Sequence, residues 1–277
     1  LNGRLTALHA CSDLWACGAR VLAAQAVVTL PEANDSTQQT LLAQTLAGIR
    51  SALNEQGAEL IGGHTLEARD GLAQPPLSRA VQVTLSVSGQ PDSAFWPKTG
   101  LHEGDRLLLS RPLGTGVLFA AAMTGTAPVS ALDTALKQMG TSQHCVLEEL
   151  LDLQREHPDA IHAATDITGF GLLGHLGEML RDPGLKLVLD GPQIPALPGA
   201  LSLLQKGYVS SLAPSNRRAW SLLDAGSLQL QLNDIDPGSK EHHALLELLV
   251  DPQTCGPLLI SVSTRIAHKL TCQSHSA

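Results

Sequence analysis

The sequence predicts an α/β (α+β) protein with two domains. Segments with helical periodicity alternate with short apolar strands along the whole chain, and no repeat or low-complexity tract interrupts them. A segment rich in proline and glycine, residues 89–100, predicts a linker. Aromatic residues make up only 3% of the 277 residues, so a core of alanine, leucine and valine is expected. We therefore expect a first domain over residues 1–93 and a second over residues 94–277.

Local signals predict the elements of the first domain. Alanine and leucine favour an opening helix, Pro31 ends the first strand, and Asn34 is one of three polar residues that can cap the next helix. Apolar and polar side chains alternate from Val81 to Val87, which is typical of a half-buried strand. The expected elements are a helix over residues 1–17, a strand over 21–30, a helix from about 35 to 56, a short buried strand over 58–61 and a strand over 78–88.

In the second domain, short apolar runs again predict strands, and longer runs with helical periodicity predict helices. Prolines between residues 192 and 198 predict a loop. The expected strands cover residues 106–110, 161–165, 185–189, 228–232 and 258–262, and the expected helices cover residues 114–124, 131–139, 143–155, 172–180 and 242–250.

Charge and cysteine usage exclude several classes of protein. The net charge is −8 with histidine neutral, and no basic stripe is present, so a nucleic-acid partner is not expected. Five scattered cysteines without a CxxC pair predict reduced thiols and a cytoplasmic protein. No apolar run is long enough to span a membrane, and the first residues have no basic segment before an apolar stretch, so we do not expect them to be a signal peptide. The chain opens at Leu1, without an initiator methionine and within an expected helix, so we interpret it as a fragment.

The segment 164–175, with the sequence ATDITGFGLLGH, is the most informative one. Asp166 ends an apolar strand, and a glycine-rich turn follows it and opens into an apolar helix. Ligands bind at such junctions of α/β folds because backbone N–H groups point outward there. An acid at this place opposes an anion unless a cation lies between them, which predicts a phosphate site bridged by a metal ion. The alternative for Asp166 alone is a helix N-cap.

Asp13 is the only acid between Leu1 and Leu30. One interpretation is a solvated residue on the surface of a helix. The other is a Mg²⁺ ligand, because Mg²⁺ is held by one or two carboxylates together with water and substrate phosphates. Asp13 and Asp166, one in each domain, together favour the second interpretation.

Two glycine-containing motifs are weaker signals. Gly62, Gly63, His64 and Thr65 follow the short strand, and glycines there permit close approach to a phosphate, although a plain β-turn has the same composition. The motif PLGTG at residues 112–116 either binds an anion or packs tightly. The chain has no P-loop, no serine nucleophile elbow and no paired histidine spacing typical of a metal site.

Five motifs, in this order along the chain, resemble those of the selenophosphate synthetase (selenide, water dikinase) family. The runs TDITGFGLLGH at 165–175 and DPQT at 251–254 are specific, and the others support them. The resemblance covers residues 1 to about 262. The wider superfamily includes aminoimidazole ribonucleotide synthetase, thiamine-monophosphate kinase and a hydrogenase maturation factor. The motifs are SDL with CG at residues 12–18, GGHT at 62–65, PLGTG at 112–116, TDITGFGLLGH at 165–175 and DPQTCG at 251–256.

The resemblance implies an aminoimidazole ribonucleotide synthetase-like fold with an incomplete N-terminal domain that pairs into a homodimer. It implies that ATP and Mg²⁺ bind, with Asp13 and Asp166 as metal ligands and Asp13 also near the nucleotide. Nucleotide contacts across the dimer are implied for Gly62, Gly63 and His64, and Thr65 adds a hydroxyl donor. The implied reaction converts ATP, selenide and water into selenophosphate, AMP and phosphate.

The chain also departs from the family pattern. The family's reactive Cys or selenocysteine, its nearby Lys and a further metal-binding Asp belong to a segment upstream of Leu1, so no catalytic residue is assigned and the chain alone is expected to be nearly inactive. Arg111, His9 and Pro257 stand where the family has Lys, Asn and Gly. The sequence from Ser263 onward predicts no closing strand. The alternatives are another ATP-dependent kinase or synthetase of the superfamily, or a non-catalytic binding and dimerisation module of a fusion protein.

Overall fold

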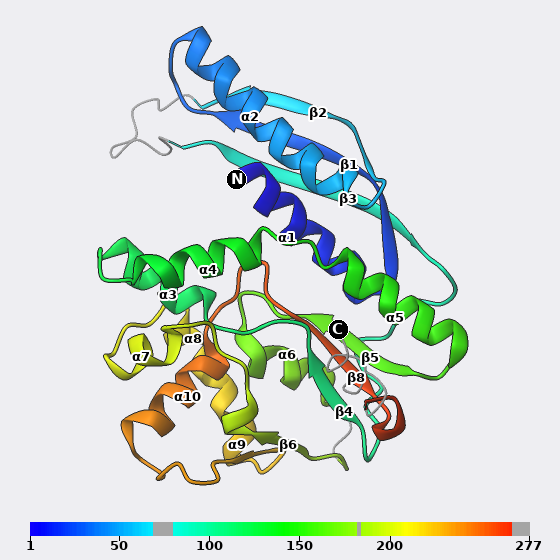
Figure 1. The fold of residues 1–277 in the computed structure, drawn as a ribbon, viewed down its shortest axis with the longest axis vertical. Coiled ribbons are helices and arrows are strands. Elements are labelled where there is room, and N and C mark those ends of the chain that lie inside the picture. The colour runs from blue at the N-terminus through cyan, green and yellow to red at the C-terminus, as the bar shows by residue number, and fades with distance from the viewer. Residues whose placement is uncertain (69–79, 182–183, 268–277) are drawn as a thin grey trace. The chain divides into compact units, whose positions relative to one another are not determined.

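The fold was analysed in a computed structural model, which describes residues 1–68, 80–181 and 184–267. The chain forms two compact units, one of residues 1–95 and 140–148, the other of residues 96–139 and the chain from 149 onward. Helices and strands are mixed in both units, as the sequence predicts (Figure 1).

The first unit is a three-stranded sheet with two helices packed on it and on each other (Figure 1). The central strand β1 pairs in parallel with β2 and antiparallel with β3. Side chains of β1 alternate between buried and exposed positions, so one face of the sheet is covered and the other is open. The elements are α1 (Asn2–Ala16), β1 (Ala19–Leu30), α2 (Asp35–Asn54), β2 (Glu59–Glu67) and β3 (Gln82–Pro91).

Local chemistry explains the boundaries of α2. The Asn34 side chain accepts a hydrogen bond of 2.9 Å from the Thr37 backbone N–H, as expected of an N-cap.

Strand β3 begins at Gln82, and the start expected for it at residue 78 lies outside the described residues. β3 also continues through Gly89, which pairs with Val21, so the first part of the expected linker is strand.

The prediction of a short buried strand at residues 58–61 is wrong in length and burial. Strand β2 runs on through Gly62–Thr65 to Glu67, and nearly all of its residues are exposed. It lies at the edge of the sheet, where only β1 pairs with it. An apolar run such as Leu60–Ile61 is therefore compatible with an exposed edge strand as well as with a buried one.

The second unit is built around the antiparallel sheet β4-β8-β5, with the parallel pair β6-β7 beside a leucine-rich group of helices. Helix α10 packs against α6 and α7, and α3 packs against α4 and α7. The strands are β4 (Arg106–Leu109), β5 (Ile161–Asp166), β6 (Leu187–Asp190), β7 (Leu228–Gln231) and β8 (Leu258–Val262); the longer helices are α3 (Thr115–Met123), α4 (Val129–Met139), α5 (His144–Glu156), α6 (Gly171–Met179) and α10 (Lys240–Val250).

Several short helices between β6 and β7 were not predicted. Each has six residues or fewer, too short to show a helical period in the sequence. They are α7 (Ala200–Gln205), α8 (Ala213–Asn216) and α9 (Ser221–Asp224), with the 3₁₀ turns η1 (Gly191–Gln193) and η2 (Arg217–Trp220).

The start of α5 belongs to the first unit, which the sequence did not indicate. Arg20 on β1 forms hydrogen bonds of 2.7 and 2.6 Å with the carboxylate of Glu148, and the Arg4 side chain donates to the Gly140 carbonyl at 2.7 Å.

No described helix has the length and apolar character needed to cross a lipid bilayer. The cysteines in the described part of the chain are free thiols.

Candidate functional site

Asp13 lies in the last turn of α1, and its side chain is exposed. The C-terminal end of a helix carries partial negative charge, so a carboxylate is unfavourable there unless a cation compensates it. No basic residue lies in that turn of α1. A cation bound at this carboxylate would offset the partial charge of the helix end.

The motif Gly62–Thr65 forms part of strand β2 and is not a turn, so the interpretation as a β-turn is wrong. Gly63 has a φ of +150° and pairs with Ala26 of β1. A Cβ at Gly63 would lie 1.9 Å from the Ala26 carbonyl oxygen, so no other residue fits there without moving the strand. A Cβ at Gly62 would meet open space. The two glycines thus have different roles: Gly63 permits close strand packing, and Gly62 leaves the surface open.

A hollow of about 280 Å³ lies beside this motif, between β1, β2 and α2. It is lined by Gly62, Gly63, His64 and Thr65, and Arg50 of α2 provides the one cationic side chain. No described residue forms an ion pair with Arg50. A guanidinium beside exposed glycine backbone is suited to a phosphate group. Sequence reasoning missed Arg50 because it lies on another element than the motif.

Asp166 is the last residue of β5, as predicted, and is only 7% exposed. The turn that follows it is held by backbone hydrogen bonds to the segment after α10. The Ile167 N–H donates to the Pro257 carbonyl at 2.9 Å, and the Gln253 N–H donates to the Thr168 carbonyl at 3.0 Å. Pro257, one of the departures from the family pattern, keeps the carbonyl that this contact needs. The turn therefore holds the Asp166 carboxylate on a rigid support.

His175 of α6 supports the same turn from the other side. Its Nε2 accepts a hydrogen bond of 3.1 Å from the Thr168 N–H, so Nδ1 carries the proton and points to the Glu178 carboxylate, 3.4 Å away. Burial lowers the pKa of His175, and the charge of Lys98 lowers it further, so the imidazole is neutral at pH 7. Lys98 itself pairs with Glu178 at 2.5 Å. His175 is therefore a structural support for the turn.

The motif PLGTG packs internally, which decides between the two interpretations left open for it. The N–H groups of Gly114 and Thr115, at the start of α3, donate to Gln253 Oε1 at 3.0 and 3.3 Å. The Gly116 N–H donates to Asp251 Oδ2 at 3.0 Å, and the Val117 N–H also bonds to Asp251. The backbone N–H groups at the start of α3 thus donate to two side chains of the DPQT run. None of these N–H groups remains to bind a phosphate.

Arg111, Cys11 and Cys255 are also held in internal contacts. Arg111 donates to the carbonyls of Gln138 and Cys255, and burial lowers its pKa to about 10. Burial raises the pKa of the Cys11 thiol to about 12 and that of Cys255 to about 11. Both thiols are protonated at neutral pH, so neither is an activated nucleophile.

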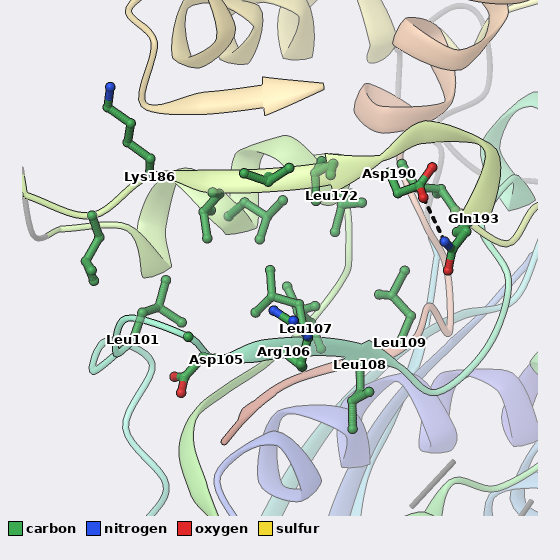
Figure 2. A pocket seen from close by; sticks show the side chains of 18 of the residues that line it. Leu101, Asp105, Arg106, Leu107, Leu108, Leu109, Leu172, Lys186, Asp190 and Gln193 are labelled. Atoms are coloured by element: carbon green, nitrogen blue, oxygen red, sulfur yellow. Dashed lines mark hydrogen bonds between the residues drawn. The ribbon is translucent and has the colours of Figure 1, made fainter. Parts of the chain in front are cut away.

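A cavity of about 1070 Å³ lies between β4 and β6 of the second unit, and none of the predicted site residues lines it (Figure 2). Leucine is the commonest residue in its wall, charged side chains such as Glu103, Arg106 and Lys186 also line it, and Gln193 donates to the Asp190 carboxylate at 2.7 Å (Figure 2). The residues predicted from the sequence to form the site thus lie outside this cavity.

Comparison with known proteins matches both units to one superfamily. Residues 2–88 match the N-terminal domain of AIR synthase related proteins, and residues 102–213 match the C-terminal domain. Among solved structures, a thiamine monophosphate kinase from Aquifex aeolicus has a TM-score of 0.60 at 15% identity, over 95% of this chain and 74% of that one. Hydrogenase maturation protein HypE in complex with ATP has a TM-score of 0.61 at 17% identity, over 96% of this chain and 64% of that one. These two likenesses show the fold.

Relatives with higher identity identify the family. The selenide, water dikinase of Pelobacter propionicus is 31% identical over 270 residues, which cover 97% of this chain and 69% of the relative. That of Trichlorobacter lovleyi is 34% identical over 262 residues, which cover 94% of this chain and 67% of the relative. The chain thus spans about two thirds of the length of these relatives. It belongs to the selenide, water dikinase (selenophosphate synthetase) family, a family of phosphotransferases.

Proposed function

We propose that this chain binds ATP with Mg²⁺ and supplies the nucleotide-binding part of an enzyme that forms selenophosphate from ATP, selenide and water, with AMP and phosphate as the other products. The observation that carries this proposal is the buried carboxylate of Asp166, held at the end of β5 by a turn with fixed hydrogen bonds. Membership of the family supports the reaction. The free thiols of the described cysteines support a cytoplasmic location.

Mg²⁺ fits the residues assigned to it. Carboxylate oxygens are the hard ligands that this ion prefers, and it keeps its remaining positions for water and substrate phosphates. Asp166 and Asp13 would hold Mg²⁺, which supplies positive charge to the phosphates when bound. Gly62, Gly63, His64 and Thr65, together with Arg50, would contact the nucleotide. These residues bind and orient phosphoryl groups, which is most of what a protein contributes to phosphoryl transfer. We assign no nucleophile to the 277 residues.

Replacement of either aspartate by asparagine is expected to weaken Mg²⁺-dependent nucleotide binding at least about tenfold, because one charged ligand is lost while the shape is kept. Calorimetric titration with a non-hydrolysable ATP analogue, with and without Mg²⁺, measures the effect for Asp13→Asn and Asp166→Asn. Asp133→Asn, an exposed acid on α4, is the matched control and should bind like the unmodified chain. Equal binding by all four proteins would remove the site assignment. Absence of binding to the unmodified chain would favour a non-catalytic module.

The first unit is proposed to form a homodimer through the open face of its sheet. That face carries exposed apolar side chains, among them Val27 on the central strand and Leu66 on β2, next to a row of polar residues of β3. Exposed apolar side chains grouped on a sheet are typical of an interface. We expect a dimer by light scattering, and a monomer when Val27→Asp places a charge in the centre of that face. A monomeric unmodified chain would contradict the proposal.

A further inference from the structure

Three side chains of metal-ligand type lie together at the start of β4, and one of them, His162, is near the opposite end of β5 from Asp166. His102 and Asp105 are the first and last residues of a β-turn, which the Asp105 N–H closes by donating to the His102 carbonyl at 3.2 Å. Gly104 takes a φ of +86° in this turn, a conformation that glycine favours. Because the first and fourth residues of a turn lie close together, His102 and Asp105 are neighbours.

His162 joins them from β5. Ile161 pairs with Val262 of β8, and Ala163 pairs with Ser261, so the register shifts at His162. Such a bulge turns a side chain away from its regular direction. His162 Nδ1 lies 2.8 Å from Asp105 Oδ1, and the His102 and His162 rings are 4.2 Å apart. One ligand atom from each of the three residues lies within 4.8 Å of the others.

The carboxylate of Asp105 is held in a defined orientation. Ser261 Oγ donates to Oδ2 at 2.7 Å, and the His102 N–H donates to the same oxygen at 2.9 Å. Burial alone would raise the pKa of Asp105, but these hydrogen bonds and the one from His162 lower it below its ordinary value, so the group is ionised at neutral pH. Figure 2 shows Asp105 at the start of β4, with its carboxylate pointing away from β6.

We propose that His102, Asp105 and His162 bind a divalent first-row transition-metal ion, with Zn²⁺ as the expected occupant. Two imidazoles and one carboxylate form a set of three ligands that leaves further positions for water. Bonds of about 2.0 to 2.1 Å to one ion separate the ligand atoms by roughly 3 to 3.5 Å, and here the three ligand atoms already lie within 4.8 Å of one another.

The ligand types separate this site from the one proposed for nucleotide. Imidazole nitrogen suits Zn²⁺ and its neighbours in the first transition row, whereas Mg²⁺ prefers oxygen ligands. When the ion binds through His162 Nδ1, it replaces the proton that Nδ1 now donates to Asp105, and that proton is released to solvent. A hydrogen-bonded His162–Asp105 pair accounts for two of the three side chains but not for the imidazole of His102 beside them.

The position indicates what the ion does. β4 and β5 are the two outer strands of the sheet, with β8 between them. An ion held by the turn before β4 and by His162 of β5 links these strands across β8, and Ser261 of β8 orients the shared carboxylate. The bound ion therefore stabilises the sheet whose strand β5 carries Asp166.

Titration of the metal-free chain with Zn²⁺ in excess Mg²⁺ tests the proposal. One equivalent is expected to bind and to raise the melting temperature. His102→Ala changes an exposed residue and should fold normally, yet bind Zn²⁺ at least about tenfold more weakly, with no gain in melting temperature. His243→Ala, a histidine whose side chain is 60% exposed on α10, is the matched control and should behave like the unmodified chain.

Titration with Co²⁺ identifies the ligands from the visible spectrum of the bound ion. Visible absorption should appear with the unmodified chain and be weaker with His102→Ala. The spectrum should lack the thiolate charge-transfer band that is expected if the exposed Cys145 held the metal. Three results would overturn the proposal: no stoichiometric binding of Zn²⁺, equal binding by His102→Ala and the control, or a thiolate band. Because nucleotide is absent from the experiment, its outcome is independent of the proposed function.

Discussion

Gly256→Ala is expected to destabilise the protein by ~3 kcal/mol and to impair Mg²⁺-dependent nucleotide binding together with it. A Cβ at this position would lie 2.0 Å from the Ile167 carbonyl oxygen and 2.7 Å from the Gln253 Cβ. Both neighbours are well fixed, since Ile167 is fully buried and bonds through its N–H to the Pro257 carbonyl. The added methyl group therefore displaces the turn that directly follows Asp166.

Gly169→Ala is the matched control for this prediction. Gly169 belongs to the same turn, but a Cβ there would meet no atom within 4 Å. Denaturant unfolding and nucleotide titration of both variants separate the two parts of the expectation. If Gly256→Ala is as stable as Gly169→Ala, Ile167 and Gln253 do not pack against Gly256 as closely as described here. If it is destabilised but its folded fraction binds nucleotide with unchanged affinity, the Asp166 turn is not part of the nucleotide site.

The sequence predicted most helices and strands because their apolar residues repeat with a clear period and their ends carry ordinary signals. Asn34 caps α2 as expected, and Asp166 ends β5 as expected. The motifs of the second unit were harder to interpret. PLGTG has the composition of an anion-binding turn, and only the fold shows that Gln253, 139 residues after Gly114, occupies its donors.

Glycine was the main source of error in the first unit. Gly62 and Gly63 suggested a turn, because glycine is common where a chain reverses. The requirement at Gly63 instead comes from the Ala26 carbonyl on the neighbouring strand, which local sequence does not reveal. The metal-ligand cluster was missed for a similar reason: His162 lies 57 residues from Asp105 and meets it only through the sheet. The domain boundary at residues 93 and 94 and the roles of the site residues stay predictions.

Asp251→Asn is expected to remove a pH dependence of stability between about pH 4 and pH 7. Burial raises the pKa of Asp251 from 3.8 to about 7, despite hydrogen bonds from Val117, Gln253 and Gly116 that lower it. In that window the folded state holds a proton that the unfolded state has lost. The contribution of Asp251 to the free energy of unfolding is therefore largest below pH 4. It falls as the pH rises to 7, by about 1.4 kcal/mol per pH unit at most.

Asparagine keeps an oxygen that can accept from the N–H groups at the start of α3, and it has no charge to bury. The variant should match the unmodified chain near pH 4 and exceed it in stability at pH 8, with an upper bound of about 4 kcal/mol for the whole window. Urea unfolding at several pH values measures the difference, and Asp133→Asn should show none. A constant difference between Asp251→Asn and the unmodified chain would mean that Asp251 is ionised in the folded state across this range. The helix dipole of α3 and the donors of Gly116 and Val117 would then outweigh the burial of the carboxylate.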